Sequence, residues 1–397
     1  MSEGIQPSRR AIIGAPLLAL AAITIEGIAA VPASATGRTS QPGWAGRPSG
    51  LGVRGADLSF TLQEEAAGNS YTNLQGHRHP VEKILASAGA NWARLRVWVD
   101  PPAGYSDLPA ALRLAQRCRG AGLKVLLDLH YSDFWADPGK QATPAAWVGQ
   151  DLTQLNETVR GYTRQVVDAF ARQGTPIDMI QIGNEITNGM LWPLGQIYND
   201  SGKHWDPLVS LLDAGLTGAR EGTPRHHELA TMVHIDRGGD NGGSRYFYDN
   251  IIQREVDFDI IGLSFYPFWH GPLSALQANL NDLAGRYGKD LVVAETAYPW
   301  TLADGDNLAN SLNSTAQLPE ATHYPATRSG QRDYFEALRN VIQQVPSGHG
   351  LGFFDWEPEW IPGVGWEPGQ GNPNDNLTMF DFHGHALPAL NAFRAGG

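Results

Sequence analysis

The chain has 397 residues, of which 42% are hydrophobic and 18% charged, and its formal net charge is −12. This composition is typical of a globular protein that is long enough for one large barrel or two ordinary domains. Because phosphate contacts need clustered cations and the sequence has no run of Lys or Arg, the charge argues against a nucleic acid as partner.

The N-terminal residues have the features of an export signal. Ser8-Arg9-Arg10 precede an apolar run, and Ala33-Ser34-Ala35 has the small-x-small form of a signal-peptidase site. The paired arginines resemble a twin-arginine signal, which exports folded proteins. We therefore predict a signal peptide over residues 1–35 and a secreted, extracellular mature protein.

A membrane anchor is the alternative for this segment, because the apolar run is close to the minimum length of a membrane span. The charge of Glu26 inside the run and the cleavage signal after it favour removal, which leaves no membrane contact in the mature form. Residues 36–50 are rich in Gly, Ser, Pro and Thr and predict a flexible lead-in to the folded domain.

Eight short apolar runs follow, with stretches of helical spacing such as Pro80–Ala88 and Leu152–Arg172 between them. The runs are Val53–Ala56, Ala93–Val97, Lys124–Leu129, Met179–Ile182, Leu229–His234, Ile260–Ser264, Leu291–Ala294 and Leu351–Phe354. Several are continuously apolar, as expected for parallel strands that are buried on both faces. This repetition predicts an α/β fold, a single (β/α)8 TIM barrel over residues 51–397. The one cysteine, Cys118, lies in an amphipathic stretch and leaves no disulfide and no CxxC motif.

Polar and aromatic residues follow nearly every run, at the end of the strands where barrel active sites lie. They include Asp57, Arg96, Trp98, His130, Asn184, Glu185, His234, Tyr266, Glu295 and Trp356. A helix cap explains one such residue, but packing does not explain their repetition after almost every strand. We therefore predict an active site at the carboxyl ends of the strands.

Two glutamates predict the chemistry of this site. Glu185 follows the fourth run and Glu295 the seventh, so they lie on nearly opposite sides of the barrel mouth. Glycosidic bonds are cleaved by two carboxyl groups, one of which protonates the leaving oxygen while the other attacks. Asn184 can donate to the sugar 2-hydroxyl, and Tyr266 and Arg96 are expected to keep Glu295 ionised, since a cation and hydrogen-bond donors lower a carboxylate pKa.

The motifs around these residues are similar to those of glycoside hydrolase family 53, the endo-β-1,4-galactanases of the retaining clan A. The matching segments are Gly55-Ala56-Asp57-Leu58-Ser59, Arg94-Leu95-Arg96-Val97-Trp98, residues 130–138, Gly183-Asn184-Glu185-Ile186, residues 191–195, residues 266–271, Val293-Ala294-Glu295-Thr296 and residues 356–360. The segments after the third and sixth strands are long and specific to that family rather than to the clan.

The resemblance implies endo-acting, retaining hydrolysis of β-1,4-galactan, the polysaccharide side chain of type I arabinogalactan and of pectin, by a monomer that needs no cofactor for the chemistry. Glu185 is then the general acid/base and Glu295 the nucleophile. The implied subsite for the attacked sugar is formed by Asp57, Arg96, His130, Asn184, Tyr266 and Trp356, with Trp98, Trp135 and Trp269 expected to stack on sugar rings.

The resemblance also implies a structural calcium ion between the loops after the seventh and eighth strands. The candidate ligands are Asp304, Asp306 and Asn310 in the first loop and Asn372 and Asp375 in the second, and hard oxygen donors of this kind suit calcium. Leu308 stands where the family has a histidine.

Two alternatives remain at this point. Another clan A endo-glycanase, such as a mannanase or cellulase, has the same carboxylate pair, although the segments after the third and sixth strands argue against it. A non-catalytic carbohydrate-binding barrel generally loses one of the carboxylates, and this chain has both.

Overall fold

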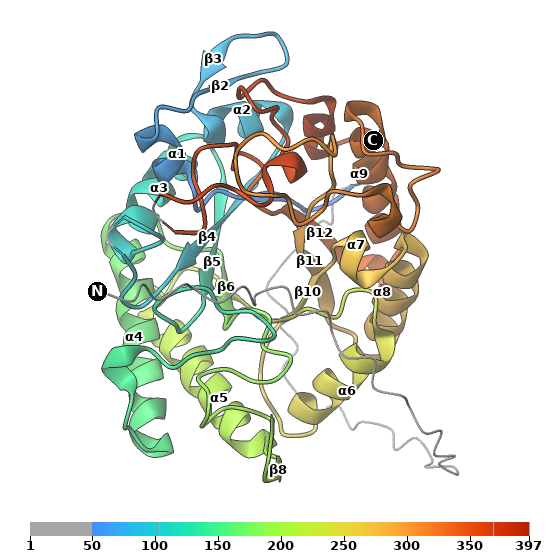
Figure 1. Ribbon diagram of the computed structural model, residues 1–397. Coiled ribbons are helices and arrows are strands. Elements are labelled where there is room, and N and C mark those ends of the chain that lie inside the picture. The colour runs from blue at the N-terminus through green and yellow to red at the C-terminus, as the bar shows by residue number, and fades with distance from the viewer. Residues whose placement is uncertain (1–49, 103, 368, 397) are drawn as a thin grey trace, which may run out of the picture. The chain divides into compact units, whose positions relative to one another are not determined.

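The computed structural model describes residues 50–396 except 103 and 368, and eight parallel strands close into a barrel within them (Figure 1). In order around the barrel the strands are β1 (Val53–Asp57), β4 (Trp92–Val97), β5 (Lys124–Leu129), β6 (Met179–Ile182), β9 (Ala230–Ile235), β10 (Ile260–Ser264), β11 (Asp290–Thr296) and β12 (Gly350–Asp355). The predicted single (β/α)8 barrel is confirmed. Each predicted run coincides with one barrel strand, with ends that differ by at most two residues.

Helices surround the barrel and connect its strands (Figure 1). They are α1 (Thr61–Ala66), α2 (Val81–Ala88), α3 (Leu108–Gly120), α4 (Leu152–Arg172), α5 (Trp205–Gly222), α6 (Asn241–Ile252), α7 (Pro267–His270), α8 (Leu273–Tyr287) and α9 (Arg328–Gln343). Helix α4 begins at a capping box between Asp151 and Gln154, and buries Leu155, Val159 and Phe170 along one face at helical spacing. No helix among the described residues is both long and apolar enough to cross a bilayer.

The loops contain short hairpins and turns of 3-10 helix. Two small hairpins are formed by β2 (Tyr71–Thr72) with β3 (Arg78–His79) and by β7 (Tyr198–Asn199) with β8 (Gly202–Lys203). Turns of 3-10 helix occupy Ala145–Trp147, Thr315–Gln317, Pro346–Gly348, Asp375–Leu377 and Pro388–Phe393. The predicted signal peptide over residues 1–35, and the predicted lead-in over residues 36–50 apart from its last residue, lie outside the described residues.

The inside of the barrel has an apolar layer, which we call the floor. It consists of Val53, Trp92, Leu126, Met179, Ala230, Met232, Ile260, Val292, Ala294, Leu351 and Phe354, all buried and drawn from all eight strands. Two residues further along their strands, Arg94, Asp128 and His234 are also fully buried, but they are polar. Side chains two residues apart point to the same face of a strand, so this polar layer lies directly above the floor at the mouth.

Candidate active site

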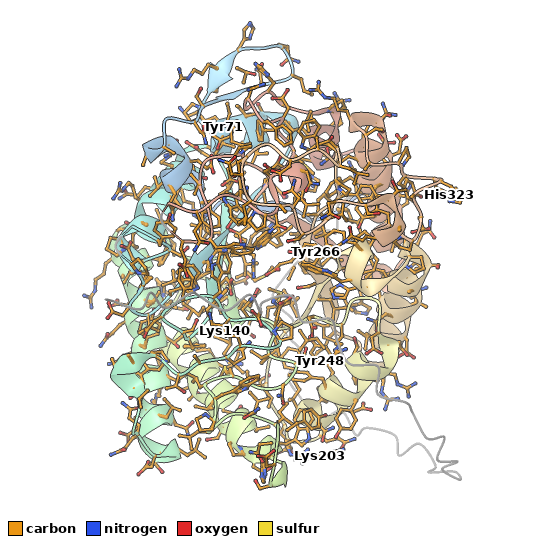
Figure 2. The ribbon with its side chains drawn as sticks, viewed as in Figure 1. Tyr71, Lys140, Lys203, Tyr248, Tyr266 and His323 are labelled. Atoms are coloured by element: carbon orange, nitrogen blue, oxygen red, sulfur yellow. The ribbon has the colours of Figure 1, made fainter. Side chains whose placement is uncertain are left out.

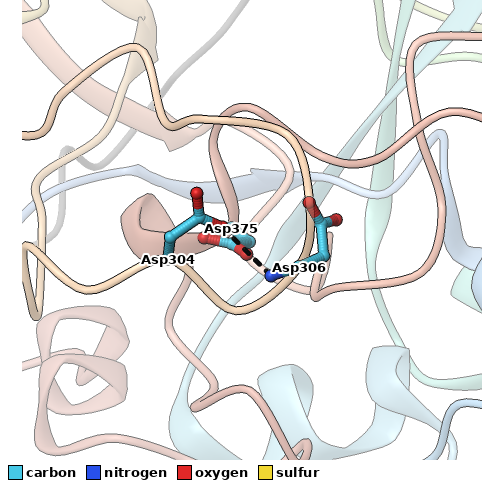
Figure 3. A group of neighbouring side chains, drawn as sticks. All are labelled: Asp304, Asp306 and Asp375. Atoms are coloured by element: carbon cyan, nitrogen blue, oxygen red, sulfur yellow. Dashed lines mark hydrogen bonds between the residues drawn. The ribbon is translucent and has the colours of Figure 1, made fainter.

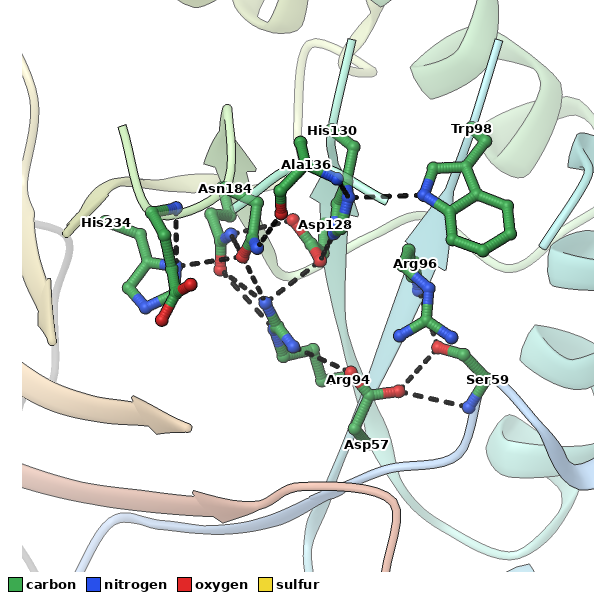
Figure 4. A network of polar contacts seen from close by, with 12 residues as sticks. Asp57, Ser59, Arg94, Arg96, Trp98, Asp128, His130, Ala136, Asn184 and His234 are labelled. Carbon is green, nitrogen blue, oxygen red and sulfur yellow. Dashed lines mark hydrogen bonds and ion pairs between the residues drawn. The ribbon is translucent and has the colours of Figure 1, made fainter. Parts of the chain in front are cut away.

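Arg94 stands at the centre of the polar layer (Figure 4). Its guanidinium forms ion pairs with Asp57 at 2.7 Å, Asp128 at 2.9 Å and Glu295 at 2.7 Å, and donates to Asn184 Oδ1 at 2.9 Å. Burial opposes the charge of Arg94, but its surrounding carboxylates outweigh that effect and raise its pKa, so the guanidinium stays protonated.

Glu295 is buried near the end of β11 and is held from two sides. Arg94 contacts one carboxylate oxygen, and the Tyr266 hydroxyl donates to the other at 2.9 Å. Burial raises the pKa of Glu295, while Arg94 and the Tyr266 hydrogen bond oppose that rise. A carboxylate that is aligned and charge-stabilised in this way is suited to act as a nucleophile.

The expectation that Arg96 accompanies Glu295 is wrong, because Arg94 fills that place. Arg96 forms its ion pair with Glu357 at 2.9 Å, and its guanidinium carbon lies 4.2 Å from the centre of the Trp135 ring. Both arginines point to the same face of β4, since they are two residues apart. Arg94 is the nearer to the floor and reaches the depth at which Glu295 lies.

Glu185 lies across the mouth, just beyond β6, in a different environment. It has a φ of +48°, a left-handed conformation that non-glycine residues seldom adopt and that is often found at functional sites. The hydroxyl of Ser264 is 2.6 Å from its carboxyl group. Burial and then the charge of Glu295 raise the pKa of Glu185 well above its usual range. No cation is among the main causes of that shift, whereas Arg94 lowers the pKa of Glu295, so Glu185 is the better proton donor of the two.

A chain of side-chain amides and imidazole connects the two glutamates. The Asn184 oxygen accepts from Arg94 and from Gln181 at 2.9 Å each, and lies 3.0 Å from His234 Nδ1. His234 Nε2 in turn lies 2.9 Å from the Ser264 hydroxyl that contacts Glu185.

His130 and Asp57 belong to the same buried layer, as the sequence predicts for the mouth. His130 Nε2 lies 2.9 Å from Asp128, and Asp57 accepts from Ser59 as well as from Arg94. Trp98 is only 1% exposed and donates from its indole nitrogen to His130 Nδ1 at 3.1 Å. The stacking role expected for Trp98 is therefore wrong, because the ring faces are covered by protein and its contact is with His130.

Aromatic side chains form one wall of the mouth beside Trp356. The half-buried rings of Trp135 and Trp356 have centres 6.1 Å apart, and Trp356 lies 6.5 Å from Tyr266, which Figure 2 labels close to the opening of the barrel. Trp269 follows Tyr266 on α7 and is 64% exposed. These three tryptophans, unlike Trp98, keep part of their surface exposed.

Sequence reasoning missed several residues of the site. Arg94, Asp128, Gln181 and Ser264 lie inside the apolar runs, and Trp366 packs against both Trp135 and Trp356. Arg94, Asp128 and Gln181 had a signal in the sequence, because each is a polar or charged residue within a strand that is otherwise buried on both faces. Such a buried group needs a hydrogen-bond or ion-pair partner. For Trp366, which lies in a loop, the sequence holds no comparable signal.

Three aspartates gather at a second place, between the loops that follow β11 and β12 (Figure 3). Oxygens of Asp304, Asp306 and Asp375 lie within 4.8 Å of one another. Burial raises the pKa of Asp375 to about 6, opposed by hydrogen bonds from Asn310 and Gly305 and assisted by the other two aspartates. Asn310 is buried and donates to Asp375 at 2.8 Å, while its own oxygen has no hydrogen-bond partner.

The side chain of Asn372 does not join this cluster, contrary to expectation. It donates to the Trp360 carbonyl and accepts from the Asn374 amide, and only its backbone N–H reaches Asp306, at 2.7 Å. The donor set that remains, carboxylates with one amide oxygen, fits a hard cation such as calcium. Leu308 donates its amide to Asp306 and presents no side-chain ligand.

Comparisons with known proteins give matches over most of the chain. A model of the family described as glycosyl hydrolase family 53 matches residues 53–393. The chain is 38% identical over 322 residues to arabinogalactan endo-beta-1,4-galactanase A of Aspergillus niger, covering 78% of this chain and 86% of that protein. It is 42% identical over 348 residues to an uncharacterized protein of Niallia circulans, covering 87% and 94%. Among solved structures, the GH53 catalytic domain of Ignisphaera aggregans superposes with a TM-score of 0.81 at 36% identity, covering 87% of this chain and 96% of that one.

Proposed function

The chain belongs to glycosyl hydrolase family 53 and is a glycoside hydrolase, and we propose that it cleaves internal β-1,4-galactosidic bonds of arabinogalactan and pectic galactan with Glu185 as acid/base and Glu295 as nucleophile. The observation that carries the roles is the contrast between the two carboxyl groups. Glu295 has a cation and a phenol against it, whereas Glu185 has a hydroxyl and forms no ion pair with any residue that the structure describes. The galactanase name of the Aspergillus niger relative supports the substrate.

In the first step the Glu295 carboxylate attacks the anomeric carbon while Glu185 gives its proton to the departing glycosidic oxygen. The new bond is a glycosyl ester, and the bond that breaks is the one to the leaving sugar. Arg94 balances the negative charge of Glu295 before attack, and the Tyr266 hydroxyl keeps the second carboxylate oxygen in place.

In the second step Glu185, now ionised, takes a proton from water as that water attacks the anomeric carbon. The glycosyl ester breaks, Glu295 is released as a carboxylate and Glu185 regains its proton. Two inversions at the same carbon give net retention. No cofactor takes part in either step.

We assign the sugar-contacting surface to the accessible aromatic side chains Trp135, Trp356 and Trp269. Flat apolar faces suit the apolar faces of sugar rings, and Trp269 is the most exposed of the three. Asn184, Asp57, Arg96 and His130 support the proposed subsite from beneath, through the contacts described above.

A structural calcium ion between the loops after β11 and β12 is part of the proposal. Asp304, Asp306, Asp375 and the oxygen of Asn310 would hold it, since three clustered carboxylates repel one another unless a cation lies between them. The ion would join the two loops and takes no part in the reaction. Export by the signal peptide at residues 1–35, with action outside the cell as a monomer, completes the proposal.

The roles are tested with Glu295→Gln and Glu185→Gln, matched substitutions that keep size and remove the charge. Glu295→Gln should abolish turnover of galactan and of an aryl β-galactobioside alike, because no nucleophile remains. Glu185→Gln should lose about 10²- to 10⁴-fold in kcat on galactan but far less on the aryl substrate, whose leaving group needs no protonation.

Reducing-sugar assays on galactan, arabinan, mannan, xylan and cellulose test the substrate. Equal losses of the two variants on the aryl substrate would contradict the roles. Faster cleavage of mannan or cellulose than of galactan by the wild type would contradict the substrate while leaving the roles intact.

A further inference from the structure

The orientation of the Asn184 amide is fixed by its neighbours. Arg94 has only N–H donors, so the Asn184 atom that it contacts at 2.9 Å must be the oxygen. The amide nitrogen of Asn184 donates in the opposite direction, to the Ala136 carbonyl at 3.0 Å. Asn184 therefore presents an acceptor to His234 (Figure 4).

This acceptor decides which nitrogen of His234 carries the proton. Burial, followed by the charge of Arg94, lowers the pKa of His234 well below its usual value, so the ring is neutral and has one donor and one acceptor. Nδ1 lies 3.0 Å from the Asn184 oxygen, which has no hydrogen to give, so Nδ1 donates. The backbone N–H of Glu185 is directed at the same nitrogen, but at a longer 3.4 Å, so the 3.0 Å contact with the Asn184 oxygen sets the tautomer. Nε2 is consequently the acceptor.

The same reasoning passes from His234 to Ser264 and then to Glu185. Nε2 accepts, so the Ser264 hydroxyl, 2.9 Å away, points its hydrogen towards the ring. That hydroxyl then has only lone pairs left for the Glu185 oxygen at 2.6 Å. Two acceptors cannot share this contact, and it becomes a hydrogen bond when Glu185 carries the proton.

We propose that His234 and Ser264 are positioning residues that hold Glu185 in its protonated form, by a chain of hydrogen bonds that starts at Arg94. The inference rests on the proposed role of Glu185 as acid/base. Arg94 then determines the protonation state of both glutamates. Its charge favours the ionised form of Glu295, and its hydrogen bond to Asn184 favours the protonated form of Glu185. After Glu185 has given up its proton, rotation of the Ser264 hydroxyl lets it donate to the carboxylate, which supports the second step.

Other charged groups face Glu185 and remain in place when this chain is altered. They are Glu295 on β11, Asp236 after β9 and Asp137 in the loop after β5, all of which favour the protonated acid, together with Tyr266 after β10. In the described part of the chain, the side chains of Glu295, Asp236 and Asp137 form no hydrogen bond with the side chain of His234 or Ser264. Substitution of His234 therefore changes the hydrogen-bond chain and leaves these charges in place.

The variant that tests the chain is His234→Asn. An Asn amide occupies the place of Nδ1 and keeps a donor for Asn184, but it has no atom at the place of Nε2. Ser264 is then free to donate to an ionised Glu185. The alkaline limb of kcat/KM on galactan, which reports the loss of the Glu185 proton, should move down by about one pH unit. An aryl β-galactobioside that needs no proton should show no such shift.

The double variant His234→Asn/Ser264→Ala shows whether His234 acts through the hydroxyl. Compared with Ser264→Ala alone, the double variant should have an unchanged alkaline limb. An equal shift with and without the hydroxyl, or no shift in folded His234→Asn, would overturn the proposal. If galactan is not the substrate, the same limb is measured on whichever β-glycan is cleaved, so the two proposals fail separately.

Neutron diffraction on the deuterated wild-type enzyme tests the chain without any substitution. Below the alkaline limb we expect deuterium on His234 Nδ1, none on Nε2, the Ser264 deuterium directed to Nε2, and a deuterated Glu185. Deuterium on Nε2 would refute the chain even if the variants fail to fold.

Discussion

The floor and the mouth of this barrel are built from the same strands, two residues apart, and follow opposite rules. Trp92, Leu126 and Met232 belong to the floor, whereas Arg94, Asp128 and His234 follow them at the mouth. In the floor, stability comes from filled volume, and neighbouring apolar side chains of similar size are nearly interchangeable. At the mouth every buried group needs one particular partner, because an unpaired buried charge is costly.

The difference shows what each layer contributes. Replacing a buried ion pair by apolar groups is often neutral or stabilising, so the network of Arg94, Asp57, Asp128 and Glu295 is poorly explained as a device for stability. It opposes the rise in the pKa of Glu295 that burial causes. The floor supplies a rigid base on which those distances are kept.

Removal of the central cation should have the largest effect. Arg94→Met leaves Glu295, Asp57 and Asp128 without their counter-charge, and the pKa of Glu295 should rise by about one to three units. Because Glu295 must be ionised to attack, the acidic limb of kcat/KM should move up by that amount, with about 3–5 kcal/mol lost from the free energy of unfolding.

Arg96→Met is the matched control for Arg94→Met, as it removes a buried arginine of the same strand that pairs with Glu357. It should destabilise the protein but leave the acidic limb in place. pH–rate profiles and thermal unfolding of both variants measure this. Equal shifts of the acidic limb in the two variants would mean that the summed charges at the mouth, rather than the direct contact with Arg94, keep Glu295 ionised.

In the floor, Leu126→Ala should cost about 2–5 kcal/mol of unfolding free energy through lost burial and the cavity left behind. Activity per folded molecule should change little, since Leu126 lies one layer below the polar groups that hold the two glutamates. Denaturant unfolding gives the first quantity and kcat on galactan below the unfolding temperature gives the second. A large loss of kcat in a fully folded variant would show that the two layers are not separable.

Asp128, two residues along, should behave differently with pH. Burial alone would raise its pKa, but Arg94 and His130 outweigh burial and lower the pKa to about 2, below the 3.8 of an unperturbed aspartate. Because the pKa of Asp128 is lower in the folded than in the unfolded protein, its charged form stabilises the fold at any pH above the unfolded-state pKa. That stabilisation is lost as the pH falls through the folded-state pKa. The pH-dependent part of the unfolding free energy that Asp128→Asn removes should therefore be about 2 kcal/mol at pH 7 and shrink between roughly pH 4 and pH 2.

Leu126→Ala is the reference for that comparison, because no titrating group is removed. Its cost in unfolding free energy should be the same at both ends of the pH range in which the protein stays folded. Denaturant titrations of the two variants at several pH values would measure the contrast. A cost of Asp128→Asn that does not vary with pH would indicate that Asp128 is protonated in the folded protein.

Chelation of calcium at the loops outside the barrel should affect stability alone. A bound ion stabilises the folded chain by mass action, about 2.7 kcal/mol at a hundredfold excess over Kd, so chelator should lower Tm by a few degrees. Asp306→Ala should remove most of that sensitivity, while kcat on galactan should remain because the ion lies apart from both glutamates. An unchanged Tm in excess chelator would mean that direct hydrogen bonds, such as that from Asn310 to Asp375, hold the loops together.

The barrel could be predicted from the sequence because each strand leaves a short apolar run and each run is followed by polar residues. A buried parallel strand has no polar face, and the mouth of a barrel collects strand ends, so Glu185 and Glu295 were placed on opposite sides of one opening by order along the chain alone. The three clustered aspartates were likewise predicted from the resemblance, without any knowledge of distance.

Only the tertiary structure decided which side chain meets which. Arg94 and Arg96 are equivalent by pattern, since both point to the same face of β4, and the stagger of neighbouring strands brings Arg94 to the depth of Glu295 and Arg96 to Glu357. Trp98 and Trp269 both follow a strand, yet one is covered by neighbouring loops and the other is exposed. Sequence spacing determines the face to which a residue points, whereas depth and cover depend on strands and loops that are distant along the chain.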